Sequence, residues 1–231
     1  FLVVLILLDG YKLVRPRWIA GLIAAGAVAA VASLFLNGAI LDHTEIDENQ
    51  LVRIIAPALE ELLKGAIVIV LLMRRRIGFL VDAAIVGFAV GAGFALVENP
   101  SYFFILEDRS LALWVVRGFG TAVMHGGVTA IFAMIAKSLA DRNGGARWWV
   151  FFPGFAVAWT LHSIFNHFPI SPILAAAVTL LILPTILFLL FERNETTIHN
   201  FLELDFAAHR RLLKQIRHGE FSGCEAGRFL K

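Results

Sequence analysis

Two adjacent carboxylates lie in the middle of an apolar segment of this sequence. Glu60 and Glu61, followed by Lys64, fall within the largely apolar run of residues 51 to 73. A charged side chain at the centre of a bilayer costs about 2.5 to 3.5 kcal/mol on insertion scales, so such residues are usually functional. The alternative is an ion pair that only locks helix packing. We favour chemistry, because a carboxylate in a water-poor site can act as a general base that activates water.

The spacing of these three residues divides their roles. Lys64 lies four residues after Glu60 and three after Glu61, so on a helix its ammonium group can neutralise one carboxylate. Neighbouring residues on a helix point about 100° apart, so the two carboxylates cannot enter one cavity in the same way. We therefore expect one glutamate to be the reacting group and the other to support it.

Four more polar residues interrupt apolar segments. His125 precedes two glycines, which leave room for another helix, water or substrate. His162 and Asn166 are one helical turn apart and share a face, from which both could donate hydrogen bonds to a developing oxyanion. Glu98, just before Pro100, is a site acid, a residue of an access path or a polar break in a helix. The cost of burying it favours a place in the site.

The composition indicates the elements that must position these groups. The chain is 59% hydrophobic and 16% charged, whereas a soluble domain carries about 25% charged residues. Apolar runs near 20 residues suit a hydrocarbon core roughly 30 Å thick, and the alternation of a membrane β-barrel is missing. We predict an all-α, polytopic transmembrane helical bundle with six full spans plus a truncated N-terminal span. The predicted spans are residues 1 to 8 (truncated), 18 to 41, 51 to 73, 79 to 105, 113 to 136, 148 to 168 and 171 to 191.

The loops between these spans alternate in charge. The basic loops are residues 12 to 17, 74 to 76 and 137 to 147, to which the tail is added; the others are residues 42 to 50, 107 to 112 and 169 to 172. The positive-inside rule puts the basic loops and the C-terminal tail in the cytoplasm. At about 1.5 Å per residue, Glu60, Glu98, His125 and His162 then lie roughly 9 to 18 Å below the outer surface. We expect them to share one cavity in the extracytoplasmic half of the membrane.

The domain organisation follows from the same pattern. We expect residues 1–191 to form one transmembrane domain that holds these polar residues, and residues 192–231 a cytoplasmic tail that is amphipathic or partly ordered. Because the chain begins inside an apolar run, we expect it to lack its true start. The single cysteine excludes an internal disulfide, and nothing in the charge distribution indicates a nucleic-acid partner. Gly87, Gly91 and Gly93 predict close packing between helices.

The polar motifs, taken in order, resemble those of the PrsW family of intramembrane proteases. That family belongs to a superfamily that includes CAAX-type prenyl proteases and bacteriocin-processing or immunity proteins. The CAAX-type relatives usually have Glu-Glu-x-x-x-Arg, so the lysine of this chain disfavours a prenyl-protein substrate. The resemblance covers about residues 9 to 190. The motifs that carry it are Glu60-Glu61-x-x-Lys64, Glu98-Asn99-x-x-Tyr102, His125 and His162-x-x-x-Asn166.

The resemblance implies a glutamate-dependent peptidase of the bacterial cytoplasmic membrane. Glu60 would be the general base, and His125 would help to hold the water. Glu61 and Lys64 would support Glu60, while His162 would stabilise the oxyanion together with Asn166. The family role is the first cut of a membrane-anchored anti-sigma factor, made near the extracytoplasmic face in regulated intramembrane proteolysis. The expected partners are therefore the lipid bilayer and a membrane-anchored protein substrate.

Three alternatives remain open from the sequence. Zinc at Glu60, His125 and His162 would make a metalloprotease. Because the chain has no His-Glu-x-x-His and the histidines come from separate helices, we rank metal-free hydrolysis higher and expect no cofactor. The buried Glu and His could instead form the relay of a proton-coupled transporter or channel, although no internal repeat is visible. The third alternative is a non-catalytic, immunity-type relative.

Overall fold

The computed structural model describes residues 16–105, 116–167, 173–174, 177–182, 185, 188–189, 210 and 217. The chain divides into two compact units, residues 1–188 and 189–231. Each element described in the first unit is a helix. These helices are α2 (Pro16–His43), α3 (Glu48–Gln50), the π-helical η1 (Leu51–Ile55), α4 (Ala56–Met73), α5 (Leu80–Ile105), the π-helical η2 (Val116–Thr121), α7 (Ala122–Arg142), the 3₁₀-helical η3 (Trp148–Val150) and α8 (Phe151–His167).

Four stretches of helix are long and apolar enough to cross a membrane. They correspond to four of the six predicted full spans, and they are Pro16–His43, Leu80–Ser101, Gly118–Arg142 and Trp148–His167. The predicted span 51 to 73 is also helical, as η1 and α4, but Glu60, Glu61 and Lys64 give α4 more charged residues than the apolar windows of the other four stretches contain. The truncated span, most of the segment 171 to 191 and nearly all of the tail lie outside the described residues. The described part thus contains the four candidate spans and α4, which is apolar apart from these charged residues and Pro57.

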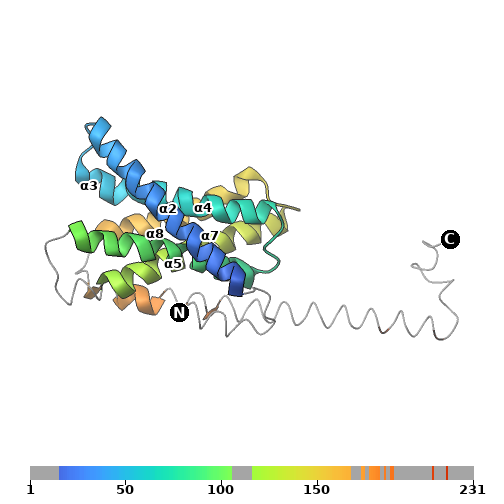
Figure 1. Cartoon of the computed structure of the whole chain (residues 1–231). Coiled ribbons are helices and arrows are strands. Elements are labelled where there is room, and N and C mark those ends of the chain that lie inside the picture. The colour runs from blue at the N-terminus through green and yellow to red at the C-terminus, as the bar shows by residue number, and fades with distance from the viewer. Residues whose placement is uncertain are drawn as a thin grey trace. The chain divides into compact units, whose positions relative to one another are not determined.

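Helix α5 lies at the centre of the first unit. It packs against α2 on one side and α7 on the other, and α8 packs against α7 and α4 (Figure 1). The close approach depends on glycine. A Cβ at Gly91 would collide with the backbone of His125, and one at Gly93 would collide with the backbone of Ile23. The close helix packing predicted from these small residues is confirmed, and it holds His125 tightly against α5.

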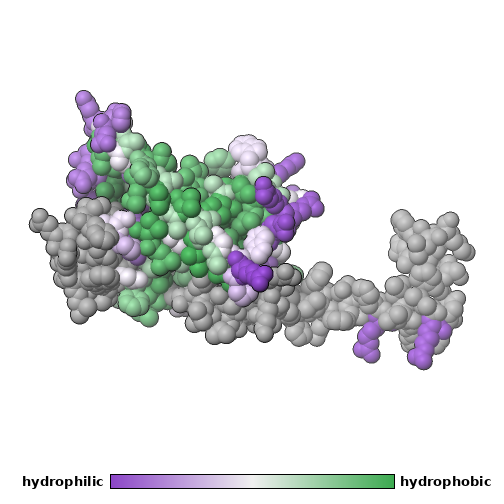
Figure 2. Space-filling model, in the orientation of Figure 1, coloured by the Kyte–Doolittle hydropathy of each residue, from purple (hydrophilic) through white to green (hydrophobic). Residues whose placement is uncertain are grey.

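The surface of this unit suits a bilayer. Figure 2 shows apolar residues across the middle of the visible face, between hydrophilic residues at two opposite ends. Large apolar side chains such as Val28 and Phe35 on α2 are more than two-thirds exposed, although they lie in a long apolar helix. Apolar side chains exposed in this number and arrangement are expected to face lipid. The fold is that of an integral membrane protein.

Three basic segments lie at the same end of the bundle. The guanidinium group of Arg76 is 5.7 Å from the ring centre of Trp18, which brings the end of α4 to the start of α2. Arg75, Lys137 and Arg147 line one cavity, which brings the same end of α4 to the end of α7 and the start of η3. The three basic segments that the sequence predicts on one side of the membrane therefore lie together at one end of the described bundle. The loops 107 to 112 and 169 to 172 and nearly all of the tail lie outside the described residues.

Candidate active site

Six buried ionisable side chains meet between α4, α5, α7 and α8. Each of them is less than a tenth exposed. They are Glu60, Glu61 and Lys64 on α4, Glu98 on α5, His125 on α7 and His162 on α8. These are six of the seven side chains that the sequence marked as site candidates. The seventh, Asn166, has a different partner, described below.

Lys64 links the carboxylates to the first histidine. Its Nζ donates to Glu61 Oε1 at 2.5 Å and to His125 Nδ1 at 2.9 Å. Because Nδ1 of His125 accepts from an ammonium group, its Nε2 carries the hydrogen and donates to Glu98 Oε2 at 2.6 Å. Lys64 thus neutralises one carboxylate, as its spacing predicted. His125 is held at both ring nitrogens.

His162 lies between the two adjacent glutamates. Its Nδ1 is 2.8 Å from Glu61 Oε1, and its Nε2 is 3.7 Å from Glu60 Oε2. A neutral imidazole that donates from Nδ1 to Glu61 turns the lone pair of Nε2 toward the second carboxylate. Two electron-rich groups would then face each other, and a cation between them, either a proton or a metal ion, would remove their repulsion. The two carboxylates have different positions around one ring, as their separation on the helix predicted.

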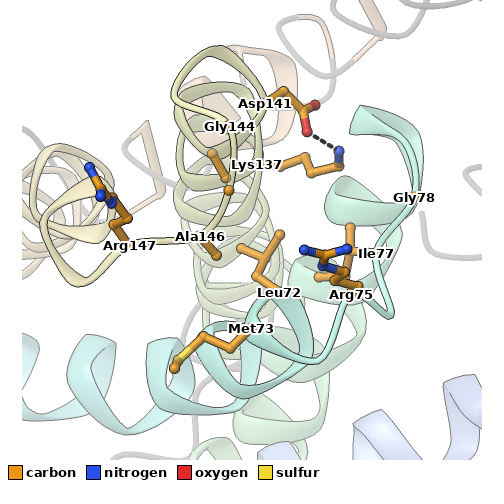
Figure 3. A pocket seen from close by; sticks show the side chains of 12 residues that line it. Leu72, Met73, Arg75, Ile77, Gly78, Lys137, Asp141, Gly144, Ala146 and Arg147 are labelled. Atoms are coloured by element: carbon orange, nitrogen blue, oxygen red, sulfur yellow. Dashed lines mark hydrogen bonds and ion pairs between the residues drawn. The ribbon is translucent and has the colours of Figure 1, made fainter.

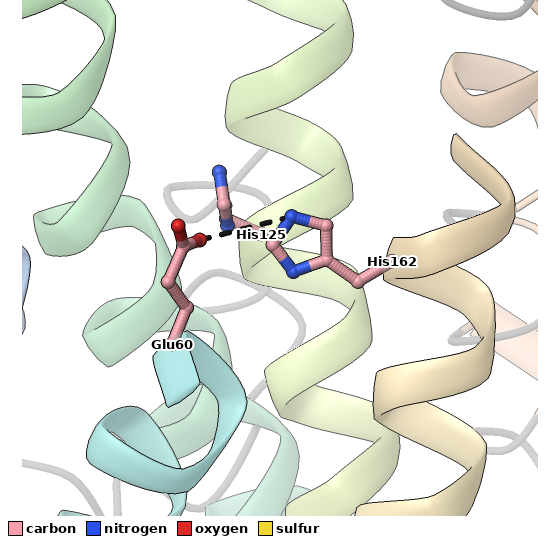
Figure 4. Close-up of side chains that lie close together, drawn as sticks. All are labelled: Glu60, His125 and His162. Carbon is pink, nitrogen blue, oxygen red and sulfur yellow. Dashed lines mark ion pairs between the residues drawn. The ribbon is translucent and has the colours of Figure 1, made fainter. Parts of the chain in front are cut away.

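Three of these residues could hold a metal ion. Glu60, His125 and His162 each offer one ligand atom, and these atoms lie within 4.8 Å of one another (Figure 4). Two imidazoles and a carboxylate are the protein ligands of one class of catalytic zinc site. The bond from His162 Nδ1 to Glu61 is the outer-shell carboxylate contact that metal-bound histidines usually make. Since both nitrogens of His125 are engaged, a metal ion here would replace one of its partners.

The charge of the cluster also suits a divalent cation. Glu60, Glu61 and Glu98 bring three carboxyl groups to a buried cluster that contains one ammonium group, that of Lys64. A divalent ion at Glu60, His125 and His162 would add positive charge where acidic groups outnumber basic ones. The donor set, the outer carboxylate and the charge therefore fit a metal at this place.

The start of α4 positions both glutamates, and Pro57 determines its local structure. Proline has no backbone N–H, so the carbonyl groups four and five residues before it, at Arg53 and Val52, lose a helical donor. The chain over Leu51–Ile55 forms a π-helical turn, in which the N–H of Ala56 bonds to the carbonyl of Leu51. Such turns are often found at functional sites. The turn therefore leaves backbone carbonyl groups without a helical partner. Because a membrane interior has no water to bond them, they need hydrogen-bond donors from another helix.

Side chains of α8 supply these donors. Asn166 Nδ2 donates to the Val52 carbonyl at 2.9 Å, and Ser163 Oγ donates to the Arg53 carbonyl at 2.6 Å. One turn earlier, Trp159 Nε1 donates to the carbonyl of the next residue, Ile54, at 2.9 Å. We call Trp159, Ser163 and Asn166 the α8 clamp. It fixes α8 along the start of α4 and so sets His162 against the two glutamates.

Sequence reasoning missed two members of the α8 clamp and one aromatic residue of the cluster. The polar positions 159, 163 and 166 recur on one face of an apolar helix, and that spacing was the available signal. Phe94 gave no polar signal. Its ring centre lies 4.6 Å from Lys64 Nζ and 5.0 Å from the ring centre of His125, so it contributes a cation–π contact to the buried ammonium.

The cluster lies away from the basic end of the bundle. Along α7, His125 is twelve residues from Lys137, which is about 18 Å, and Glu60 on α4 is at a comparable distance from Arg74. The predicted common depth of Glu60, Glu98, His125 and His162 agrees with their meeting in one cluster. The site is therefore in the half of the bundle opposite the three basic segments.

Comparison with known proteins adds one finding. A family model described as "PrsW family intramembrane metalloprotease" matches residues 15–191. The matched region contains all six residues of the cluster, the α8 clamp and every helix from α2 to α8. No curated protein and no solved structure matches the chain.

Proposed function

Because the chain belongs to the PrsW family of intramembrane proteases and is a peptidase, we propose that Glu60, His125 and His162 form its catalytic centre. The observation that carries the proposal is the convergence of these three side chains from three helices to within 4.8 Å, buried inside a membrane protein. The reaction is hydrolysis of a peptide bond in a membrane-anchored protein. The cluster must therefore bring a water molecule to a scissile carbonyl group.

The side chains of the chain itself have distinct tasks. In the metal-free mechanism predicted from the sequence, Glu60 takes the proton of the attacking water as the general base. His125 would hold that water after one of its ring nitrogens releases Lys64 or Glu98. Glu61 fixes the ring orientation of His162, while Lys64 neutralises Glu61. His162 turns Nε2 toward the reacting centre, and in the imidazolium form, which carries hydrogen on both nitrogens, it would donate from Nε2 to the developing oxyanion.

The geometry changes the order in which we rank metal-free and metal-dependent hydrolysis. From the sequence, the separate helices of the histidines argued against zinc. In the folded chain these helices bring the three ligand atoms to within 4.8 Å of one another. A divalent ion held by Glu60, His125 and His162 would polarise the water and the scissile carbonyl. We therefore propose the metal-dependent mechanism, in agreement with the family description.

The substrate and the side of cleavage follow from the resemblance and the topology. We propose a single-span protein such as an anti-sigma factor, cut near the extracytoplasmic face of a bacterial cytoplasmic membrane. Two observations support this side. The cluster lies in the half of the bundle away from the basic segments, and the positive-inside rule puts those segments in the cytoplasm.

Substitution of Glu60 tests the proposal. Purified Glu60→Gln protein should cleave a single-span substrate about 100- to 10,000-fold more slowly than wild type, because it lacks the carboxylate. His125→Ala and His162→Ala should show losses of the same order. The matched control is Glu48→Gln, which neutralises an exposed acid outside the cluster and should leave the rate unchanged. Equal cleavage by Glu60→Gln and wild type would refute the assignment.

One observation favours a second function. Hydrogen bonds run without interruption from Glu98 through His125, Lys64 and Glu61 to His162, which is the arrangement of a proton relay. Proton flux into liposomes separates the two functions. Flux that is lost in His125→Ala, in protein that cuts no peptide, would favour the relay over the peptidase.

A further inference from the structure

A second cavity lies at the basic end of the bundle, far from the catalytic cluster. It has a volume of about 730 Å³, which is within the range of small-molecule sites. Its walls are the end of α4 with the following loop, the end of α7, and the loop that leads to η3. Lys137 in its wall and His125 in the cluster are twelve residues apart on α7, about 18 Å. The cavity is separate from the site of the proposed chemistry.

Three cationic side chains from three different segments line this cavity. Figure 3 shows Lys137 and Arg75 on one side of it and Arg147 on the other. Asp141 is the one acid of the lining, and its Oδ1 pairs with Lys137 Nζ at 2.5 Å. Because Asp141 neutralises Lys137, Arg75 and Arg147 give the lining a net positive charge. The cavity is therefore suited to an anion.

The backbone around the cavity has an unusual conformation. The three positive-φ residues in the part of the chain that the structure describes all line it: Arg75 at 54°, Gly144 at 70° and Gly145 at 146°. Arg75 and Gly144 follow the ends of α4 and α7, where glycine is the usual left-handed residue. An arginine at that position is less favourable than a glycine. Arg75 thus adopts a costly conformation at a position where its side chain lines the cavity.

The rest of the lining and the neighbouring surface indicate what kind of anion binds. Leu72, Met73 and Ile77 give the cavity an apolar wall, and Met73 is 63% exposed. Trp18 and Trp148 are exposed at the same end of the bundle, and exposed tryptophans are typical of the headgroup level of a bilayer. An anionic group with an attached apolar chain would contact both kinds of wall. Basic pockets between membrane helices on the cytoplasmic side bind lipid phosphates in this way.

We propose that this cavity binds the phosphate headgroup of an anionic phospholipid. Arg75 and Arg147 contact the phosphate from opposite sides, and the acyl chains lie along Met73 toward the bilayer. Lys137, on the same side of the cavity as Arg75, stays paired with Asp141. Exposed arginines are also common at helix C-termini and in cytoplasmic loops that bind no particular lipid. The test must therefore distinguish binding in this cavity from general attraction of anionic lipid to a basic surface.

Lipid retention by matched double variants makes that separation. The purified chain is incubated with equal amounts of phosphatidylglycerol and phosphatidylcholine in neutral detergent, washed, and analysed for bound lipid by mass spectrometry. Wild type should retain phosphatidylglycerol in preference to phosphatidylcholine. Arg75→Gln/Arg147→Gln should retain about thirtyfold less phosphatidylglycerol, as expected for the loss of two arginines at a membrane surface. Arg74→Gln/Arg142→Gln removes the same charge from exposed positions outside the lining and should behave like wild type.

Three outcomes would overturn the proposal. Equal losses in the two double variants would mean that surface charge alone attracts the lipid, and equal retention by all proteins would mean that the cavity does not bind it. Inorganic phosphate without lipid is the third arm. If phosphate raises the unfolding temperature of wild type but not of Arg75→Gln/Arg147→Gln, and no lipid is retained, the ligand is a soluble phosphate. Unfolding temperatures without ligand show whether each variant is folded, and none of these measurements requires peptidase activity.

Discussion

At the residue scale, the imidazole of His162 contacts both adjacent glutamates and so sets their relative positions in the cluster. One of its nitrogens faces Glu61 and the other faces Glu60, so a single ring separates two adjacent carboxylates. The glutamate bound to Nδ1, Glu61, is neutralised by Lys64, and the one near Nε2, Glu60, is the proposed reacting group. Neither carboxylate could exchange roles with the other, because their directions on α4 differ by about 100°.

Metal removal is the sharpest test at this scale. We expect the purified peptidase to lose its activity after exhaustive chelation and to regain it with one equivalent of zinc. Glu61→Gln should weaken zinc binding about 10- to 100-fold, because it removes the carboxylate that orients His162. Cleavage assays and metal analysis on the same samples measure both effects. Glu48→Gln serves as the control for a change of charge outside the cluster.

The opposite result has a definite meaning. Full activity in protein that holds no metal would return the mechanism to the form predicted from sequence, in which Glu60 alone activates the water. Loss of activity in Glu60→Gln is expected in both mechanisms, so that substitution does not distinguish them. Chelation does distinguish them, and both mechanisms use the same three residues as the proposed catalytic centre.

At the scale of elements, the start of α4 and the polar face of α8 depend on each other. Pro57 removes donors from the preceding turn, and Asn166 and Ser163 replace them. An unsatisfied carbonyl group in a membrane costs several kcal/mol, so these bonds stabilise the π-helical turn. The same bonds fix the depth of α8 beside α4. Positioning of His162 is therefore a consequence of satisfying the backbone.

The α8 clamp leads to a prediction that separates two roles of Asn166. As a clamp residue, Asn166→Ala should lower stability by about 1 to 3 kcal/mol, and Ser163→Ala should do the same, because each leaves a carbonyl unsatisfied. As an oxyanion donor, Asn166→Ala should instead lower kcat about 100- to 1,000-fold at unchanged stability, with Ser163→Ala neutral. We expect the first pattern. Unfolding in detergent and cleavage rates measure the two quantities.

A control for the α8 clamp comes from the same helix. Thr160 Oγ1 donates to the carbonyl of Ala156, within α8, and makes no bond to the start of α4 among those the structure describes. Thr160→Ala should therefore change stability much less than Ser163→Ala does. Equal effects of the two substitutions would mean that hydroxyl loss on α8 is costly in itself, and the clamp would have no special role.

The sequence predicted which charged residues belong to the site better than it predicted their hydrogen-bond partners. Burying charge in lipid is so costly that Glu60, Glu61, Lys64 and Glu98 indicate a common cavity from the sequence alone. The partner of each group is harder to predict. The spacing of Asn166 to His162 favours an oxyanion donor, but its amide bonds to a carbonyl that a shift of backbone hydrogen bonding makes available. The spacing of polar side chains along the sequence does not reveal where backbone hydrogen bonds change from the α-helical to the π-helical pattern.

At the scale of the whole molecule, the two ends of the bundle differ in charge and in task. The basic end holds the contact between Arg76 and Trp18 and the proposed lipid cavity, whereas the opposite half holds the proposed catalytic cluster. Loop charges predicted this division, because each span reverses the direction of the chain. Contacts within the protein place the basic segments at one end of the bundle, but they do not determine which side of the bilayer that end faces. The orientation of the two ends across the bilayer is a separate property, which labelling can measure.

The single cysteine of the chain tests this orientation. Cys224 lies in the tail, outside the described residues, and the tail is predicted to be cytoplasmic. A membrane-impermeant maleimide should therefore label it only after permeabilisation of bacterial cells that express the chain. In a Cys224→Ser background, Asn49→Cys places a thiol in the exposed α3, at the opposite end, and should be labelled in intact cells. If intact cells label Cys224 and not the cysteine at position 49, the bundle is inverted. The catalytic cluster would then open toward the cytoplasm, and cleavage near the extracytoplasmic face would be untenable.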